Sequence, residues 1–118
     1  SVYKAMVTEP ILFFGTKPTS RFLDTDHLEF ITDRESGVTG THSCPKPVGL
    51  SAKLIETFSD NSVLDLFGGS GSTLIACEQL NRTCFMMELD PKYCDVIRKR
   101  YARFIGKEDE WEKVSPRI

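Results

Sequence analysis

The stretch VLDLFGGSGST, residues 63–73, combines an acidic side chain with a glycine-rich loop. Asp65 stands inside an apolar run, and Gly68, Gly69 and Gly71 follow within a few positions. A carboxylate inside an apolar strand is unfavourable to bury without a partner, and closely spaced glycines let the backbone approach a ligand. These residues therefore predict a binding loop for a small molecule.

Three ligand classes use such a loop between a strand and a helix. A phosphate-binding loop requires a lysine where this sequence has Gly71 or Ser72, so the sequence does not match that motif. A dinucleotide site requires a third glycine where Leu74 stands, so that pattern is incomplete. A site for S-adenosylmethionine requires three features. The protein backbone must approach the methionyl end closely, one acidic side chain must lie near the positively charged end, and a second must bind the ribose hydroxyls. Asp65 and Glu88 supply both acids at the spacing of a βαβ unit, and we favour this ligand.

Each candidate also has a structural interpretation. The glycines could form a plain tight turn, and Glu88 could be a strand end that faces solvent. Phe67 could belong to the core or to a ligand pocket, whereas Asp90 is better explained as a helix cap. The remaining candidates for a cofactor contact are Leu89, placed to pack on an adenine ring, and the hydroxyl residues that close the loop, Ser72 and Thr73.

The elements that must position these residues lie in the second half of the chain. We expect helices from Pro47, over residues 72–80, and from Pro91 to a stop at Gly106, with buried strands at 63–67 and 84–88. This order is a βαβ unit with a preceding helix, which implies parallel strands with helices on both faces. The predicted fold class is α/β, a mostly parallel sheet with flanking helices.

The first third of the chain is less regular. Residues 11–15 are typical of a buried strand, with residues 1–7 as a candidate partner, and residues 16–41 form a polar loop with a short strand at 28–31. We expect residues 1–41, a cofactor-binding core at 42–106 and a polar, frayed tail at 107–118 to make one structural domain. A basic cluster near the end of the last helix is expected to be a solvated face: Arg98, Lys99, Arg100 and Arg103.

Composition limits the function classes. The 118 residues suffice for one domain, and the net charge of −2 lacks the basic excess of non-specific nucleic-acid binders. No apolar run is long enough for a membrane span, and no signal peptide is visible. The four cysteines form no Cys-x-x-Cys pair, so we expect no metal site. Cys77 and Cys84 are expected to be core thiols in a reducing cytoplasm.

A further element precedes the first predicted helix. His42, Lys46 and Pro47 resemble the His-x-x-x-Lys-Pro element of amino-methylating DNA methyltransferases, which act on adenine N6 or cytosine N4. With LDLFGGSGST and ELDPKYC downstream, the order over residues 42–105 is similar to the circularly permuted class of that family. The resemblance implies a partial Rossmann-like, S-adenosylmethionine-dependent methyltransferase fold, with residues 1–41 around the target-recognition region.

The resemblance also implies roles for single residues. Lys46 and the backbone near it, with His42 and Pro47 in the same element, would hold the methionyl carboxylate. Asp65 would bind the amino group and Glu88 the ribose hydroxyls. The methionyl and sulfonium region would be lined by Phe67, Gly69 and Gly71, next to Gly68.

The catalytic loop of this family contains two adjacent prolines before an aromatic residue. The prolines here stand at positions 10, 18, 45, 47, 91 and 116, so we expect no catalytic residue in this chain and a catalytic segment upstream of Ser1. The resemblance implies S-adenosylmethionine as cofactor, double-stranded DNA bound through the complete enzyme, and a bacterial or phage restriction-modification setting in the cytoplasm. Adenine is the favoured base on family frequency alone, and a homodimer is one candidate assembly.

Two alternative functions remain open at this point. A non-catalytic remnant could bind S-adenosylmethionine or only a partner chain. A methyltransferase fragment acting on protein or RNA would share the glycine loop, although the element formed by His42, Lys46 and Pro47 argues against it.

Overall fold

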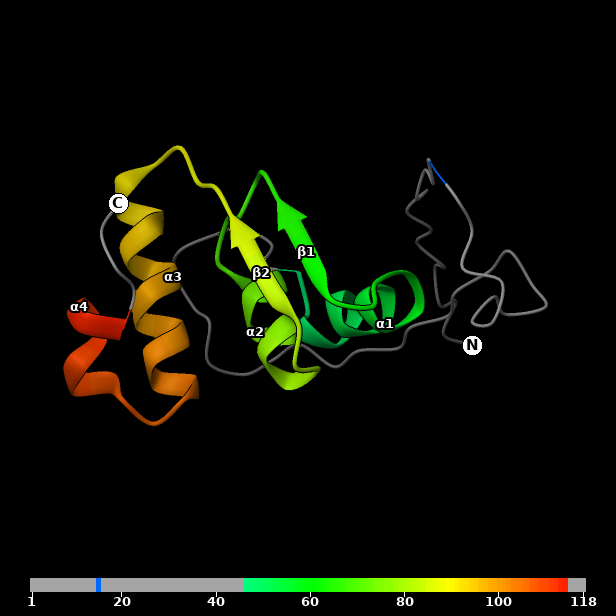
Figure 1. Ribbon diagram of the computed structural model, residues 1–118. Coiled ribbons are helices and arrows are strands. Elements are labelled where there is room, and N and C mark those ends of the chain that lie inside the picture. The colour runs from blue at the N-terminus through cyan, green and yellow to red at the C-terminus, as the bar shows by residue number, and fades with distance from the viewer. Residues whose placement is uncertain (1–14, 16–45, 115–118) are drawn as a thin grey trace, which may run out of the picture.

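The computed structural model of the protein describes Gly15 and residues 46–114 (Figure 1). The predicted strands and polar loop between residues 1 and 41 therefore lie outside the described residues, apart from Gly15. The described elements are α1 (Val48–Phe58), β1 (Ser62–Asp65), α2 (Ser72–Gln79), β2 (Thr83–Met86), α3 (Pro91–Phe104), the 3-10 turn η1 (Glu108–Glu110) and α4 (Trp111–Val114).

The two strands pair in parallel and lie side by side in Figure 1. Asp65 at the end of β1 is opposite Met86 at the end of β2, and α2 makes the crossover between them. Two backbone bonds continue past the strands, from the Met87 N–H to the Asp65 carbonyl at 2.9 Å and from the Gly68 N–H to the Met87 carbonyl at 2.8 Å. The predicted parallel βαβ unit is confirmed, and the glycine loop begins where both strands end.

The core forms where α1, α2 and one face of the sheet meet. Cys77 in α2 is fully buried, and Cys84 in β2 packs against it. Burial, followed by the neighbouring Cys77 thiol, raises the pKa of Cys84 to about 12, and burial also raises the pKa of Cys77. Both thiols therefore stay protonated at neutral pH and behave as the small apolar core residues that the sequence predicts.

The other face of the sheet carries exposed apolar side chains. Leu64 and Phe85 are cross-strand neighbours, and they are 64% and 60% exposed. Val63 and Cys84 point to the opposite face and pack against the core. Within residues 46–114 the expected strands buried on both faces are not found, because α3 packs through Tyr101 onto the same core as α1 and α2. The expected helical cover is therefore present on one face only of the described sheet.

Helix α3 begins and ends as the sequence predicts. The Asp90 side chain caps it by accepting a bond from the Lys92 N–H at 2.9 Å. At the other end Gly106 has a φ of +75°, which favours glycine, and the Lys107 N–H bonds the Ala102 carbonyl at 2.8 Å. These two caps fix the length of the helix that follows β2.

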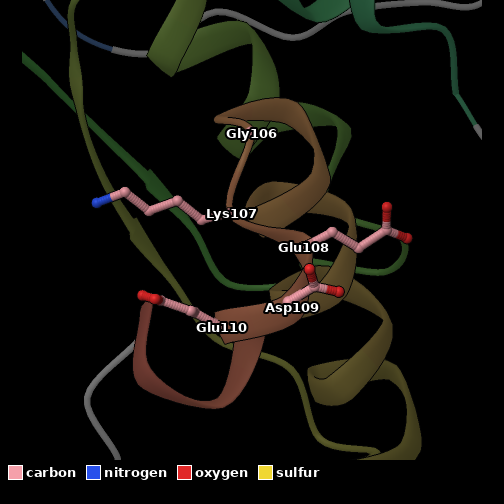
Figure 2. A pocket seen from close by; sticks show the side chains of 5 residues that line it. All are labelled: Gly106, Lys107, Glu108, Asp109 and Glu110. Atoms are coloured by element: carbon pink, nitrogen blue, oxygen red, sulfur yellow. The ribbon is translucent and has the colours of Figure 1, made fainter.

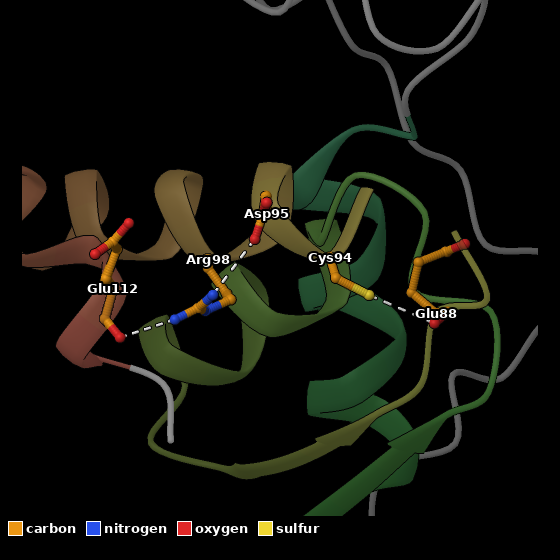
Figure 3. A network of polar contacts seen from close by, with 5 residues as sticks. All are labelled: Glu88, Cys94, Asp95, Arg98 and Glu112. Carbon is orange, nitrogen blue, oxygen red and sulfur yellow. Dashed lines mark hydrogen bonds and ion pairs between the residues drawn. The ribbon is translucent and has the colours of Figure 1, made fainter. Parts of the chain in front are cut away.

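The expected frayed tail is instead helical over residues 108–114. The Arg98 Nη2 donates to the Glu112 carbonyl at 2.8 Å, and the same side chain contacts Asp95 (Figure 3). The Trp111 ring lies 5.1 Å from the Arg98 guanidinium carbon and 4.7 Å from the Lys99 Nζ. The predicted solvated face is therefore wrong for Arg98, whose side chain is only 13% exposed, because Trp111 and α4 cover it.

Candidate cofactor site

Asp65 stands at the carboxyl end of β1 and starts the candidate site. Its Oδ1 accepts a hydrogen bond from the Phe67 N–H at 2.9 Å, and its side chain is half-buried. The sequence suggested that burying the Asp65 carboxylate would be unfavourable. The hydrogen bond to Phe67 and the remaining contact with solvent together reduce this cost. A carboxylate has several acceptor positions, so Asp65 can bind a ligand amine while it holds the turn.

The glycine loop is a tight turn whose shape the protein itself requires. A Cβ atom on Gly68 would lie 2.7 Å from the Met86 Cγ and 3.2 Å from the Ile97 Cδ1. Gly71 has a φ of +86°, and its N–H donates to the Gly68 carbonyl at 2.9 Å. Packing and backbone conformation therefore explain glycine at both positions, whatever the loop binds.

Glu88 bridges the loops that follow the two strands. Its Oε2 accepts a bond from the Gly69 N–H at 2.7 Å, and its Oε1 accepts one from the Asp90 N–H at 3.1 Å. Its carbonyl accepts a contact from the Cys94 Sγ at 3.5 Å (Figure 3). Glu88 is therefore not a plain strand end facing solvent, because its carboxylate fixes the glycine loop relative to the start of α3.

The Lys-Pro segment is tied to the same loop. The Ser72 hydroxyl donates to the Lys46 carbonyl at 2.7 Å, and Ser72 is only 7% exposed. Pro47 precedes the helix as its cap residue with an extended ψ of 138°, so α1 begins one residue later than predicted. The structure thus brings Lys46, the glycine loop and Glu88 to one edge of the sheet, and it gives Ser72 protein partners.

Two apolar side chains stand at the ends of the strands. Phe67 is 87% exposed and Leu89 is 97% exposed, so Phe67 is not part of the core. Thr73 is half-buried in the first turn of α2. His42, the first residue of the Lys-Pro element, lies outside the described residues. The site therefore has polar groups between two exposed apolar residues, which suits a ligand with both kinds of surface.

A small open hollow lies elsewhere, at the turn between α3 and η1 (Figure 2). Its charged side chains point away from the turn, and the Glu108 Oε1 forms an ion pair with the Arg103 Nη2 at 2.6 Å. It has no group in common with the residues around Glu88, and we do not connect it with the candidate site. Among residues 46–114 no cluster of His, Cys, Asp and Glu could hold a metal ion, and no described helix has the length and apolarity of a membrane span.

Arg100 has a structural role that the sequence did not predict. Its Nη1 donates to the Ser70 carbonyl at 3.1 Å, to the Ser70 hydroxyl at 3.2 Å and to the Ser72 hydroxyl at 3.1 Å. Arg100 follows Ile97 by three residues, so both lie on one face of α3. The available signal was its position on the same helical face as the apolar residue Ile97, and the solvated-face prediction is wrong for Arg100.

Comparisons with known proteins converge on one family. Residues 11–99 match the sequence model of N6 and N4 methyltransferases, described as DNA methylase. The chain is 36% identical over 64 residues to the type II methyltransferase M2.MboI of Moraxella bovis, which covers 52% of this chain and 23% of that protein. It is 42% identical over 41 residues to the type II methyltransferase M.SmaI of Serratia marcescens, which covers 35% of this chain and 14% of that protein.

A solved structure is similar in both fold and sequence. The crystal structure of M1.HpyAVI in complex with S-adenosylmethionine superimposes with a TM-score of 0.55 and 30% identity, covering 68% of this chain and 43% of that one. The chain therefore spans less than half of that protein, and its matches span less than a quarter of the two sequence relatives.

Proposed function

The chain belongs to the family of N6 and N4 DNA methyltransferases, and from that premise we propose that it is the S-adenosylmethionine-binding part of a DNA methyltransferase. The observation that carries the proposal is the Glu88 bridge at the carboxyl edge of the sheet. Open parallel sheets bind ligands at this edge, and the bridge joins the loop after one strand to the loop after the next. M1.HpyAVI, solved with S-adenosylmethionine, supports the same ligand for this chain.

In this proposal each polar residue meets a different part of the cofactor. Glu88 accepts hydrogen bonds from the ribose hydroxyls, and Asp65 binds the ammonium group. Lys46 and the backbone near it hold the carboxylate, with His42 and Pro47 as members of the same element. The apolar and small residues that line the adenine, methionyl and sulfonium parts are Leu89, Phe67, Gly68, Gly69, Gly71 and Thr73, with Ser72 supporting the loop.

We further propose that the methyl group goes to an exocyclic amine of DNA, with adenine N6 favoured over cytosine N4. The bound cofactor would supply an electrophilic methyl group, and the acceptor amine is a poor nucleophile because its lone pair is delocalised into the base. The amine therefore needs acceptors for its hydrogens and a stacked aromatic ring around a flipped base. The sequence contains no pair of adjacent prolines of the kind that builds such a loop in this family.

The division of labour in the complete enzyme follows from this. Residues 46–114 would bind and orient the methyl donor, and a catalytic segment upstream, as in the circularly permuted class, would activate the base. Double-stranded DNA would be bound by the complete enzyme in a bacterial or phage-infected cytoplasm. A homodimer is one candidate assembly of that enzyme.

Isothermal titration calorimetry of the full chain tests the proposed function. S-adenosylmethionine and its demethylated product should both release heat with a single-site isotherm, and NAD should not. The affinity should lie below that of a complete enzyme, because the catalytic loop closes part of the site. Absence of heat at millimolar S-adenosylmethionine, with circular dichroism showing a folded chain, would contradict the proposal.

A further inference from the structure

We propose that Arg100 is a positioning residue that fixes the glycine loop and, through Ser72, the Lys-Pro segment, so that the cofactor meets a preformed site. Its effect on affinity rests on the proposed function above. The residue stands in the second half of α3, 28 and 30 positions after the two serines that it contacts. Its hydrogen bonds to described residues go to Ser70 and Ser72, so it would act on the cofactor through the loop.

The contacts of Arg100 converge on one loop. Its Nη1 donates to the Ser70 carbonyl at 3.1 Å and reaches the Ser70 and Ser72 hydroxyls at 3.2 Å and 3.1 Å. Ser70 and Ser72 are 6% and 7% exposed, so water has little access to these bonds. Hydrogen bonds from a charged donor are stronger than neutral ones, and they fix the direction of the carbonyl that they meet.

The Ser72 hydroxyl extends the network to a third segment. It accepts from Arg100 and donates to the Lys46 carbonyl at 2.7 Å, so one hydroxyl links α3 to the segment that leads into α1. A hydroxyl has one donor and two acceptor positions, and this arrangement uses its donor toward Lys46. Loss of Arg100 would therefore loosen both the glycine loop and the segment proposed to hold the methionyl carboxylate.

The same face of α3 also packs against the glycine loop through Ile97. Atoms of Ile97 would lie 3.2 Å from a Cβ on Gly68 and 3.2 Å from a Cβ on Gly71. Ile97 is 8% exposed, and it stands one helical turn before Arg100. An apolar contact alone leaves the loop free to rotate its peptide groups, whereas the guanidinium fixes the carbonyl of Ser70. We therefore assign loop packing to Ile97 and loop orientation to Arg100.

The test compares Arg100→Gln with Arg103→Gln in the full chain. Arg103 is a matched control because it lies on the same helix, carries the same charge and pairs with Glu108 at the surface. Two quantities are measured for each variant: amide hydrogen exchange at Gly69 and Gly71 without ligand, and S-adenosylmethionine affinity by calorimetry. Arg100→Lys keeps the charge and part of the donor set, so it should recover part of each effect.

Arg100→Gln should raise exchange at the loop amides and weaken S-adenosylmethionine binding roughly tenfold, whereas Arg103→Gln should do neither. Unchanged loop exchange in Arg100→Gln would overturn the proposal. So would faster exchange with unchanged affinity, because the loop would then need no positioning.

Two results separate this proposal from the proposed function. If the unaltered chain binds no S-adenosylmethionine, the proposed function fails, and the exchange measurement still decides whether Arg100 holds the loop. If Arg100→Gln does not fold, Arg100→Lys tests the bonds to Ser70 with the same two measurements. Ser72→Ala then tests the link to Lys46, because it removes the bonds of that hydroxyl to Lys46 and Arg100 and leaves the charge of α3 intact.

Discussion

Glu88 is a single residue that joins the two loops of the site. Each of its two carboxylate oxygens accepts a hydrogen bond from a backbone group of a different loop. The bond to the Gly69 N–H is 2.7 Å long and the bond to the Asp90 N–H is 3.1 Å long. Hydrogen bonds to a charged group contribute about 1.5–3 kcal/mol each. The carboxylate therefore shapes the site before any ligand arrives, and its proposed ribose contacts come in addition.

We predict that Glu88→Gln weakens S-adenosylmethionine binding roughly tenfold and that Glu88→Ala weakens it roughly a hundredfold. The amide keeps one acceptor oxygen, whereas alanine removes both and also releases the Gly69 N–H. Calorimetry measures the affinities, and thermal melts check that the variants fold. Glu108→Gln is the control, because Glu108 lies at the surface and pairs with Arg103. Unchanged affinity in Glu88→Ala would refute the ribose assignment.

A second prediction at this scale concerns pH. Burial and the neighbouring Cys77 thiol raise the pKa of Cys84 from 9.0 to about 12. The stability due to this protonated thiol is therefore fully present below pH 9.0 and is lost as the pH rises toward about 12. Tyr101 acts in the same direction, since burial and its bond to Glu78 raise its pKa.

Cys84→Ala should therefore lose stability less steeply than the unaltered chain above pH 9.0. Urea unfolding at a series of pH values measures the free energy of unfolding for both proteins. The contribution of Tyr101 is common to both, so it cancels in the comparison. Equal slopes would show that the Cys84 thiol ionises in the folded protein as easily as in the unfolded chain.

The role of Arg100 could not be predicted from the sequence, whereas the helix caps could. Asp90 and Gly106 were predictable as caps because the signal and its effect lie within a few residues of each other. Arg100 acts on Ser70, 30 positions earlier in the chain, and no local pattern fixes that distance. Its role depends on how α3 packs against the loop, which the sequence alone did not define.

At the scale of elements, the βαβ unit follows from local signals. Short apolar runs predict the two strands, the glycine loop separates β1 from α2, and Asp90 caps α3. The burial of the strands was predicted wrongly, because a continuous apolar run looks the same whether one face or both faces are covered. Leu64 and Phe85 belong to such runs, and they are exposed within the described part of the chain.

A prediction for the loop between β1 and α2 concerns Gly68, where a side chain would have no room. Gly68→Ala should destabilise the fold by about 1–3 kcal/mol, because the new Cβ would crowd the Met86 and Ile97 side chains. Adding Met86→Ala should recover part of this loss, since it removes the atoms at 2.7 Å and 2.8 Å. Urea unfolding of the single and double variants measures the coupling.

Gly106→Ala is the matched control, because a Cβ there meets nothing within 4 Å and only the φ of +75° opposes it. Met86→Ala should not rescue Gly106→Ala. Equal rescue of both glycine variants would mean that Met86→Ala acts through general loosening of the core, and the close contact at Gly68 would lose its assigned effect.

At the scale of the whole molecule, the described residues expose apolar surface that folded proteins usually cover. Leu64 and Phe85 lie on one face of the two-stranded sheet, and Phe67 and Leu89 stand at its carboxyl edge. A net charge of −2 gives little electrostatic attraction to DNA over the whole chain. The apolar face is therefore available to residues outside the described part of the chain, and the low charge is compatible with our proposal that DNA is bound by the complete enzyme.

We predict that the chain alone transfers no methyl group to DNA and that the upstream segment of its parent protein restores transfer. Binding the donor does not orient or activate the acceptor amine, which requires groups placed around the flipped base. A tritiated-methyl assay on unmethylated DNA compares the chain, the upstream segment and their mixture. Label incorporated by the chain alone would contradict the prediction. Failure of the mixture, with an active parent, would exclude simple complementation.

A nuclear magnetic resonance titration of the ¹⁵N-labelled full chain with S-adenosylmethionine tests the central proposal most directly. Saturable shifts should concentrate on amides of the Glu88 bridge and the segments that it joins: Lys46, Phe67, Gly68, Gly69, Gly71 and Leu89. Amides of Gly106, which follows α3, and of Trp111, in α4, should not move. A folded spectrum without shifts at millimolar ligand, or with shifts confined to residues 106–114, would contradict S-adenosylmethionine binding at this site.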